Sequence, residues 1–274
     1  MNLKKAIKQL IPPLIDTIYH NYKNGLNGFY IWKGVFQNHL ALPVLSNSYF
    51  DQDLAKETAD YTRSLLERLK NQKRIPYHIN DENAFLPLIS AVILKNKKKI
   101  SVLDLGGGMG IGFISLLSCI EDIEELDYFV IETPVMCVGG SQLFTEDKRI
   151  HFLSEFPSKL PAIDIVFINS ALQYFEHYLD ILKRLASYNP EYFLFIKFSA
   201  GHIPTYASAQ RNLRGTTSAY WFFNVEEIIE HLSLLGYSLN YKSSISRVYD
   251  QDNFPEEYRL HNACNLLFSK NRSS

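Results

Sequence analysis

Cysteine is scarce in this chain, with only Cys119, Cys137 and Cys264 among its 274 residues. An odd number without any C-x-x-C spacing argues against a disulfide framework and against a structural zinc site. The eight histidines form no H-x-x-x-H or H-E-x-x-H arrangement either. We therefore expect no metal centre.

Long apolar runs and an excess of charge of one sign are also missing. No stretch approaches the roughly 18 to 20 apolar residues that span a bilayer, and no signal-peptide core precedes a small-residue cleavage site. Lysine and arginine number 28 against 29 acidic residues, which gives a formal net charge of −1. Nucleic acid is therefore a poor candidate partner. We expect a cytoplasmic protein without a transmembrane segment that acts on a small molecule.

The chain is long enough to bury one sizeable core, and 46% of its residues are hydrophobic. We predict an N-terminal helical cap over residues 1–79 and one α/β domain over residues 80–274. Within the cap, periodicity predicts helices over residues 3–15 and 50–70, and residues 27–36 are expected to form an aromatic loop.

Residues 102–112, which read V-L-D-L-G-G-G-M-G-I-G, are the most informative stretch. The apolar run is typical of a buried parallel strand, and the glycines after it permit positive φ and close approach of a ligand to the backbone. The glycines alternate, so Ile111 stands where a G-x-G-x-x-G dinucleotide motif has its last glycine. This spacing favours a different nucleotide-like cofactor.

A second acidic residue ends the next apolar run. Tyr128 to Ile131 lead into Glu132, and Thr133-Pro134 is typical of a helix start. In Rossmann-like units an acidic side chain at the tip of the second strand accepts hydrogen bonds from ribose hydroxyls. Glu132 is therefore a candidate ribose ligand.

Strand and helix patterns alternate regularly from residue 80 onward. We predict strands over residues 100–105, 128–132, 150–153, 163–169, 192–198, from 236 onward and over 264–268. We predict helices over residues 84–94, 111–120 and 225–235. A long loop is expected over residues 199–223. Right-handed crossovers would bring the carboxyl ends of the parallel strands to one edge, where ligands bind in such folds.

With Asp104 two residues before Gly106, the glycine turn resembles the first motif of class I S-adenosylmethionine-dependent methyltransferases. The resemblance implies a Rossmann-like three-layer sandwich with a seven-stranded, mostly parallel sheet, an antiparallel last strand and the N-terminal helical extension. It also implies S-adenosyl-L-methionine as cofactor. The cofactor-binding residues that it implies are Asp104, Gly106, Gly107, Gly108, Gly110, Glu132, Ser154, Glu155, Asn169 and Ser170.

In the resembling family, the segment after the fourth strand passes under the cofactor towards its methyl group. The resemblance thus implies that Asn169 and Ser170 contact the amino-acid moiety, whereas Ser154-Glu155 would lie at the adenine. A general base is needed mainly for a hydroxyl acceptor, and Tyr174 and His177 are the catalytic candidates for it.

The loop predicted over residues 199–223 carries side chains suited to a polar acceptor with an acidic group. They are Tyr206, Gln210, Arg211, Arg214, Tyr220 and Trp221. Together with the N-terminal cap, this loop is expected to cover the cofactor cleft and form the acceptor pocket.

A wider resemblance extends from residues 28–36 to residues 220–224 and 236–237. It is to a family of methyltransferases often encoded among surface-polysaccharide biosynthesis genes, which implies a sugar or sugar-nucleotide acceptor. Two alternatives stay open. One is a nucleotide-sugar or NAD-binding oxidoreductase, although the Y-x-x-x-K pair at Tyr19 and Lys23 precedes the glycine turn instead of following it. The other is a non-catalytic binding module on the same fold.

Overall fold

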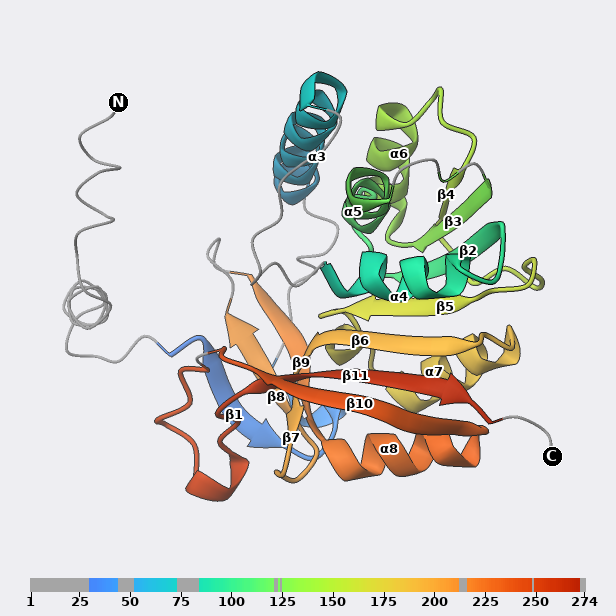
Figure 1. Ribbon diagram of the computed structural model, residues 1–274. Helices are drawn as coiled ribbons and strands as arrows, with labels where there is room; N and C mark the ends of the chain where they lie inside the picture. The colour runs from blue at the N-terminus through green and yellow to red at the C-terminus, as the bar shows by residue number, and fades with distance from the viewer. Residues whose placement is uncertain are drawn as a thin grey trace, which may run out of the picture.

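The computed structural model in Figure 1 describes residues 30–43, 52–72, 84–120, 123, 125–211, 216–247 and 249–271. The described residues form two β-sheets, with helices on both faces of the larger one. The helix predicted over residues 3–15 and the Tyr19–Lys23 pair lie outside the described residues.

The larger sheet has seven strands in the order β10-β11-β6-β5-β2-β3-β4. They are β2 (Lys99–Leu105), β3 (Glu125–Ile131), β4 (Ile150–Leu153), β5 (Ile165–Asn169), β6 (Tyr192–Phe198), β10 (Tyr237–Ile245) and β11 (Ala263–Lys270). Only β11 runs antiparallel to the other strands of this sheet. The predicted fold class is therefore confirmed, with each predicted strand present to within a few residues.

Six α-helices accompany the two sheets in the described part of the chain. They are α3 (Gln52–Gln72), α4 (Phe85–Leu94), α5 (Ile111–Cys119), α6 (Pro134–Leu143), α7 (Tyr178–Ser187) and α8 (Val225–Leu234). Short 3-10 turns occur at η1 (His39–Ala41), η4 (Leu172–Tyr174) and η5 (Glu256–Tyr258).

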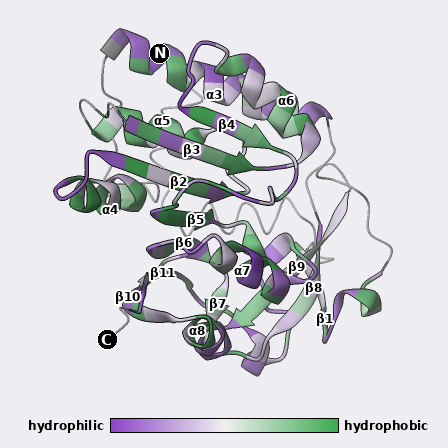
Figure 2. Ribbon diagram, turned by 90° about the vertical axis from the view of Figure 1, so that its right-hand side faces the viewer, coloured by the Kyte–Doolittle hydropathy of each residue, from purple (hydrophilic) through white to green (hydrophobic). Residues whose placement is uncertain are grey.

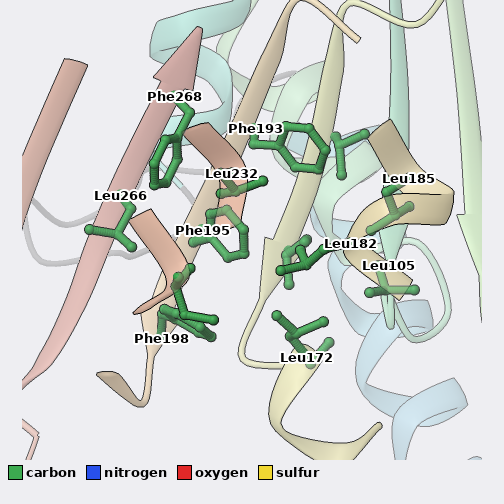
Figure 3. Close-up of a cluster of buried hydrophobic side chains, with 14 of the residues drawn as sticks. Leu105, Leu172, Leu182, Leu185, Phe193, Phe195, Phe198, Leu232, Leu266 and Phe268 are labelled. Atoms are coloured by element: carbon green, nitrogen blue, oxygen red, sulfur yellow. The ribbon is translucent and has the colours of Figure 1, made fainter. Parts of the chain in front are cut away.

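Successive strand residues point into two separate cores, one on each face of the sheet. Leu103 and Phe195 pack with α7 and α8, and Figure 3 shows this cluster with Leu182, Leu185 and Leu232 closing over the strands. Alternate strand residues form the opposite core with α4 and α5. Because both faces are covered, the central strands are apolar almost throughout, which is why the sequence predicts them well.

The second sheet was not expected from the sequence. It has the order β1-β8-β9-β7, with β1 (Trp32–Phe36), β7 (Ala200–Gly201), β8 (Tyr206–Arg211) and β9 (Thr217–Asn224). Figures 1 and 2 place it beside the half of the molecule that holds α7 and α8, away from α3, α5 and α6.

The loops predicted over residues 27–36 and 199–223 are therefore wrong where these strands form. Their aromatic side chains are buried: Trp32 packs 4.5 Å from Tyr220 and 5.0 Å from Phe222, measured between ring centroids. Burial of large aromatic surfaces stabilises this sheet although its sequence lacks clear alternation. Tyr206 and Tyr220, expected at the acceptor, belong to this core. Trp221 is buried in the other cluster, against Tyr178 of α7, and Arg214 lies outside the described residues.

The predicted N-terminal cap is only partly helical in the described residues. Helix α3 packs against α5 and α6, and its Leu65 is buried in the core beneath them. Strand β1, by contrast, pairs with β8, so that Trp32 lies opposite Gln210. The boundary predicted at residue 79 falls outside the described residues and stays a prediction. None of the described helices has both the length and the hydropathy needed to cross a bilayer.

Candidate functional site

A pocket of about 580 Å³ opens at the carboxyl ends of β2, β5, β6 and β10. This is the edge at which open parallel sheets bind ligands. Its lining consists of Tyr61, Asp104, Gly106, Gly107, Gly108, Ile111, Gly112, Phe167, Asn169, Ser170, Lys197, Ser246 and Arg247. Six of the ten predicted cofactor residues are among them: Asp104, Gly106, Gly107, Gly108, Asn169 and Ser170.

The glycines of the turn have different structural roles. At Gly107 a Cβ atom would collide with the Asp104 carboxylate, and at Gly106, where φ is +68°, it would lie 2.5 Å from the Ala171 Cβ. Gly110 is the N-cap of α5 and is enclosed by side chains of the core, not by the pocket. These three glycines are therefore required by packing and by the turn itself.

Gly108 is the exception in this turn. Its φ is +57°, and the nearest protein atom to an added Cβ is the Thr58 Cγ2, 3.8 Å away. The space beside Gly108 is thus not filled by the described part of the protein. Such a gap at a strand-to-helix turn is what close approach of a ligand to the backbone requires.

Asp104 is buried at the floor of the pocket, with 1% of its surface exposed. Its Oδ2 accepts a hydrogen bond of 2.6 Å from the Tyr128 hydroxyl. Its Oδ1 is buried and has no hydrogen-bond partner within the described residues. Burial raises the pKa of the carboxyl to about 7, with a smaller contribution from the Glu132 carboxylate. A buried polar atom without a partner is costly, so Oδ1 is positioned for a ligand donor.

Glu132 follows β3 and lies against the glycine turn. Its Oε1 accepts a hydrogen bond of 3.3 Å from the Gly108 N–H, and its Oε2 accepts one of 2.6 Å from the Thr133 N–H. Burial raises the pKa of Glu132, and these backbone hydrogen bonds partly oppose the rise. Two carboxylate oxygens offer about four acceptor positions, so not all of them are used by these two hydrogen bonds. Glu132 is not itself among the residues that line the pocket.

Ser170 connects the turn after β5 with Gln173, which the sequence suggests as a residue facing the substrate, and with Arg247, which the sequence did not single out. Its Oγ accepts from Gln173 Nε2 at 2.8 Å and from an Arg247 nitrogen at 3.3 Å. Among the described non-glycine residues only Ser170, Lys197 and Asn189 have positive φ, and the first two line the pocket. Strained backbone of this kind gathers at functional sites.

The pocket thus lies at the edge of the sheet where the sequence predicts the site, and comparison with solved structures identifies the fold. The chain superposes with a TM-score of 0.50 on the 1,6-didemethyltoxoflavin-N1-methyltransferase of Burkholderia thailandensis, which was solved with 1,6-didemethyltoxoflavin and S-adenosylhomocysteine. The two are 14% identical, and the match covers 84% of this chain and 92% of that one. The fold is that of S-adenosylmethionine-dependent methyltransferases.

Two further solved structures give slightly lower scores. The cyclase SpnF gives a TM-score of 0.49 at 12% identity, with 85% of this chain and 99% of that chain covered. A methyltransferase of Methanosarcina mazei gives a TM-score of 0.48 at 12% identity, with 67% of this chain and 98% of that chain covered. No model of a known protein family and no curated protein matches the sequence. The resemblance to a surface-polysaccharide family thus has no support beyond the residues that suggested it.

The remaining predicted residues of this methyltransferase fold lie outside the pocket lining. Ser154 and Glu155 follow β4 and are exposed. His177 is exposed at the start of α7. Tyr174 lies with its ring 5.1 Å from that of Tyr220, packed on the aromatic core of the small sheet. Their proposed roles stay predictions, without support from a contact with the pocket.

The lining also includes residues that sequence analysis missed: Tyr61 from α3, Lys197 from the end of β6, and Ser246 and Arg247 after β10. Each is separated from the glycine turn by tens of residues in the sequence. The strand order brings β6 and β10 to the turn, and packing of α3 on α5 and α6 brings Tyr61 there. The described residues contain no group of three or more His, Cys, Asp or Glu side chains suited to hold a metal ion.

Proposed function

We propose that this chain binds S-adenosyl-L-methionine in the pocket and catalyses transfer of its methyl group to a small polar acceptor. The observation that carries the proposal is the combination at the glycine turn: Gly108, beside which the space is unfilled, and Asp104, whose Oδ1 has no partner among the described residues, both line one pocket. Glu132, hydrogen-bonded to the Gly108 N–H, lies at the next strand.

The residues present fit this cofactor chemically. Asp104 Oδ1 offers an acceptor for a donor group of the amino-acid moiety, and the free acceptor positions of Glu132 suit a ribose diol. Gly108 allows the ligand to approach the main chain. When bound, S-adenosyl-L-methionine supplies an electrophilic methyl group on a sulfonium, and the task of the protein is to hold the acceptor in line with it.

The competing oxidoreductase hypothesis is disfavoured by Ile111. In a dinucleotide fold the glycine at this position permits close packing of the helix on the strand. Here Ile111 is the first residue of α5, and it lines the pocket. A branched side chain thus stands where the dinucleotide motif has its last glycine.

The acceptor is proposed to be a sugar or sugar-nucleotide, in line with the sequence resemblance. The test is a methyl-transfer assay with S-adenosyl-L-methionine carrying a labelled methyl group and pools of sugars, sugar phosphates and nucleotide sugars. We expect label in one pool, with an equal amount of S-adenosylhomocysteine formed. Binding of the cofactor without transfer to any pool would instead favour the non-catalytic module.

Replacement of Glu132 by alanine tests the ribose assignment. We expect Glu132→Ala to weaken S-adenosylhomocysteine binding by about 1 to 3 kcal/mol, the range for loss of hydrogen bonds to a charged group. Isothermal titration calorimetry measures the dissociation constant. Glu125→Ala is the matched control, because Glu125 is exposed at the opposite end of the same strand. An unchanged constant in folded Glu132→Ala would remove this residue from the site.

A further inference from the structure

The pocket extends beyond the glycine turn to a side that carries positive charge. Lys197 lies at the end of β6 and Arg247 after β10, and both line the pocket with Ser246. Asp104, the only acidic residue of the described lining, lies on β2, which β5 separates from β6 in the sheet. The basic residues and the carboxylate therefore come from different strands.

Arg247 is held in place without a carboxylate from the described residues. One guanidinium nitrogen donates to Ser170 Oγ at 3.3 Å, and the guanidinium carbon lies 5.2 Å from the centre of the Tyr249 ring. Arg247 forms no ion pair within the described part of the chain. A guanidinium has five N–H donors, so most of them are left for a ligand.

The ring beneath the guanidinium is itself fixed. Tyr249 is 8% exposed, and its hydroxyl hydrogen-bonds to Ser199 Oγ at 2.9 Å. Ser199 also hydrogen-bonds to the buried hydroxyl of Tyr220. Stacking on an immobile aromatic ring limits the rotamers of Arg247 and lowers the entropic cost of binding.

Ser170 adds a donor at the same place. Its two acceptor positions are occupied by Gln173 Nε2 and by the Arg247 nitrogen. A hydroxyl has one hydrogen and two acceptor positions, so the Ser170 O–H remains to donate. Guanidinium and hydroxyl donors thus converge beside the pocket, an arrangement that suits the oxygens of an anion.

We propose that Arg247, with Ser170, binds an anionic group of the methyl acceptor, a carboxylate or a phosphate. This inference rests on the proposed function, because it assigns the glycine-turn side of the pocket to the cofactor. A neutral acceptor would leave the guanidinium without a counter-ion in the complex. The carboxylate of the cofactor is the other anion that could reach Arg247, and the experiment separates the two.

The experiment uses the full chain and begins with calorimetric titration of S-adenosylhomocysteine. The saturated protein is then titrated with inorganic phosphate in one arm and acetate in the other. We expect saturable binding in at least one arm, with the tighter anion indicating the class of acceptor. In Arg247→Gln, anion affinity should fall about 10- to 100-fold, the range for a charge-assisted hydrogen-bond pair. The dissociation constant for S-adenosylhomocysteine should stay within about twofold of the parent value.

Lys242→Gln is the matched control, because it removes one positive charge from an exposed position on β10. It should change neither constant. Ser170→Ala, which keeps the guanidinium, should give a smaller loss of anion affinity than Arg247→Gln. The assignment would be overturned if Arg247→Gln lowered the affinity for S-adenosylhomocysteine more than tenfold. It would also be overturned if anion binding were absent or did not depend on Arg247. Failure to bind S-adenosylhomocysteine at all would instead overturn the proposed function.

Discussion

Gly108→Val should abolish S-adenosyl-L-methionine binding while the protein remains folded. Gly108 has φ of +57°, and the space beside its Cα is open to the pocket, with Thr58 Cγ2 at 3.8 Å from an added Cβ. Valine fills the space that we assign to the cofactor and resists this backbone conformation. We expect affinity to fall at least about 100-fold, well above the effect of losing one hydrogen bond. Calorimetry measures the loss, and circular dichroism checks the fold.

Gly236→Val provides the control for backbone strain. Gly236 also has a positive φ, +91°, and an added Cβ there would meet no atom within 4 Å. It lies between α8 and β10, outside the pocket lining. This variant should lose about 1 to 3 kcal/mol of stability from strain and bind the cofactor normally. Equal loss of binding in both variants, or normal binding in Gly108→Val, contradicts our assignment of the turn.

Asp104→Asn should change the pH dependence of stability. Burial raises the pKa of Asp104 from 3.8 to about 7 in the folded protein. Between these values the folded state binds more protons than the unfolded state, so this carboxyl makes stability fall as pH rises through the window. At 1.36 kcal/mol per pKa unit the upper limit is about 4 kcal/mol. Asparagine keeps an acceptor for the Tyr128 hydroxyl but cannot ionise.

The measurement is urea unfolding of the parent and of Asp104→Asn at pH 5 and at pH 8. We expect the free energy of unfolding of Asp104→Asn relative to the parent to be higher at pH 8 than at pH 5 by about 2 to 4 kcal/mol. The same variant should bind S-adenosyl-L-methionine more weakly at pH 8, because the charged acceptor at Oδ1 is lost. The same relative stability at both pH values would show that Asp104 ionises normally.

The large sheet could be predicted from the sequence because its signals are local. Strands buried on both faces give continuous apolar runs, as in residues 100–105 and 192–198, and the glycine turn marks where the first of them ends. Asp104 and Glu132 could be assigned to one edge of the sheet for the same reason, because each lies near the end of a strand with a clear local signal. To predict the cofactor side of the site, little more is needed than the strand order and the right-handed hand of the crossovers.

The small sheet and the acceptor side could not be predicted in this way. Strand β8 reads Y-A-S-A-Q-R, and its partner β1 lies more than 150 residues earlier in the chain, with Trp32 opposite Gln210. Arg247 has the same local signature as any solvated loop arginine. Its contact with Ser170 arises only because β10 joins the sheet through β11, next to β6. Tertiary pairing, not local pattern, creates that half of the pocket.

The most direct test of the central claim is calorimetric titration of the full chain with S-adenosyl-L-methionine and, separately, with NADH. We predict saturable binding of S-adenosyl-L-methionine that is lost in Gly108→Val and retained in Gly236→Val, and no binding of NADH. NADH binding of equal or greater affinity, or S-adenosyl-L-methionine binding that survives Gly108→Val, would contradict the assignment of this pocket to a methyl donor.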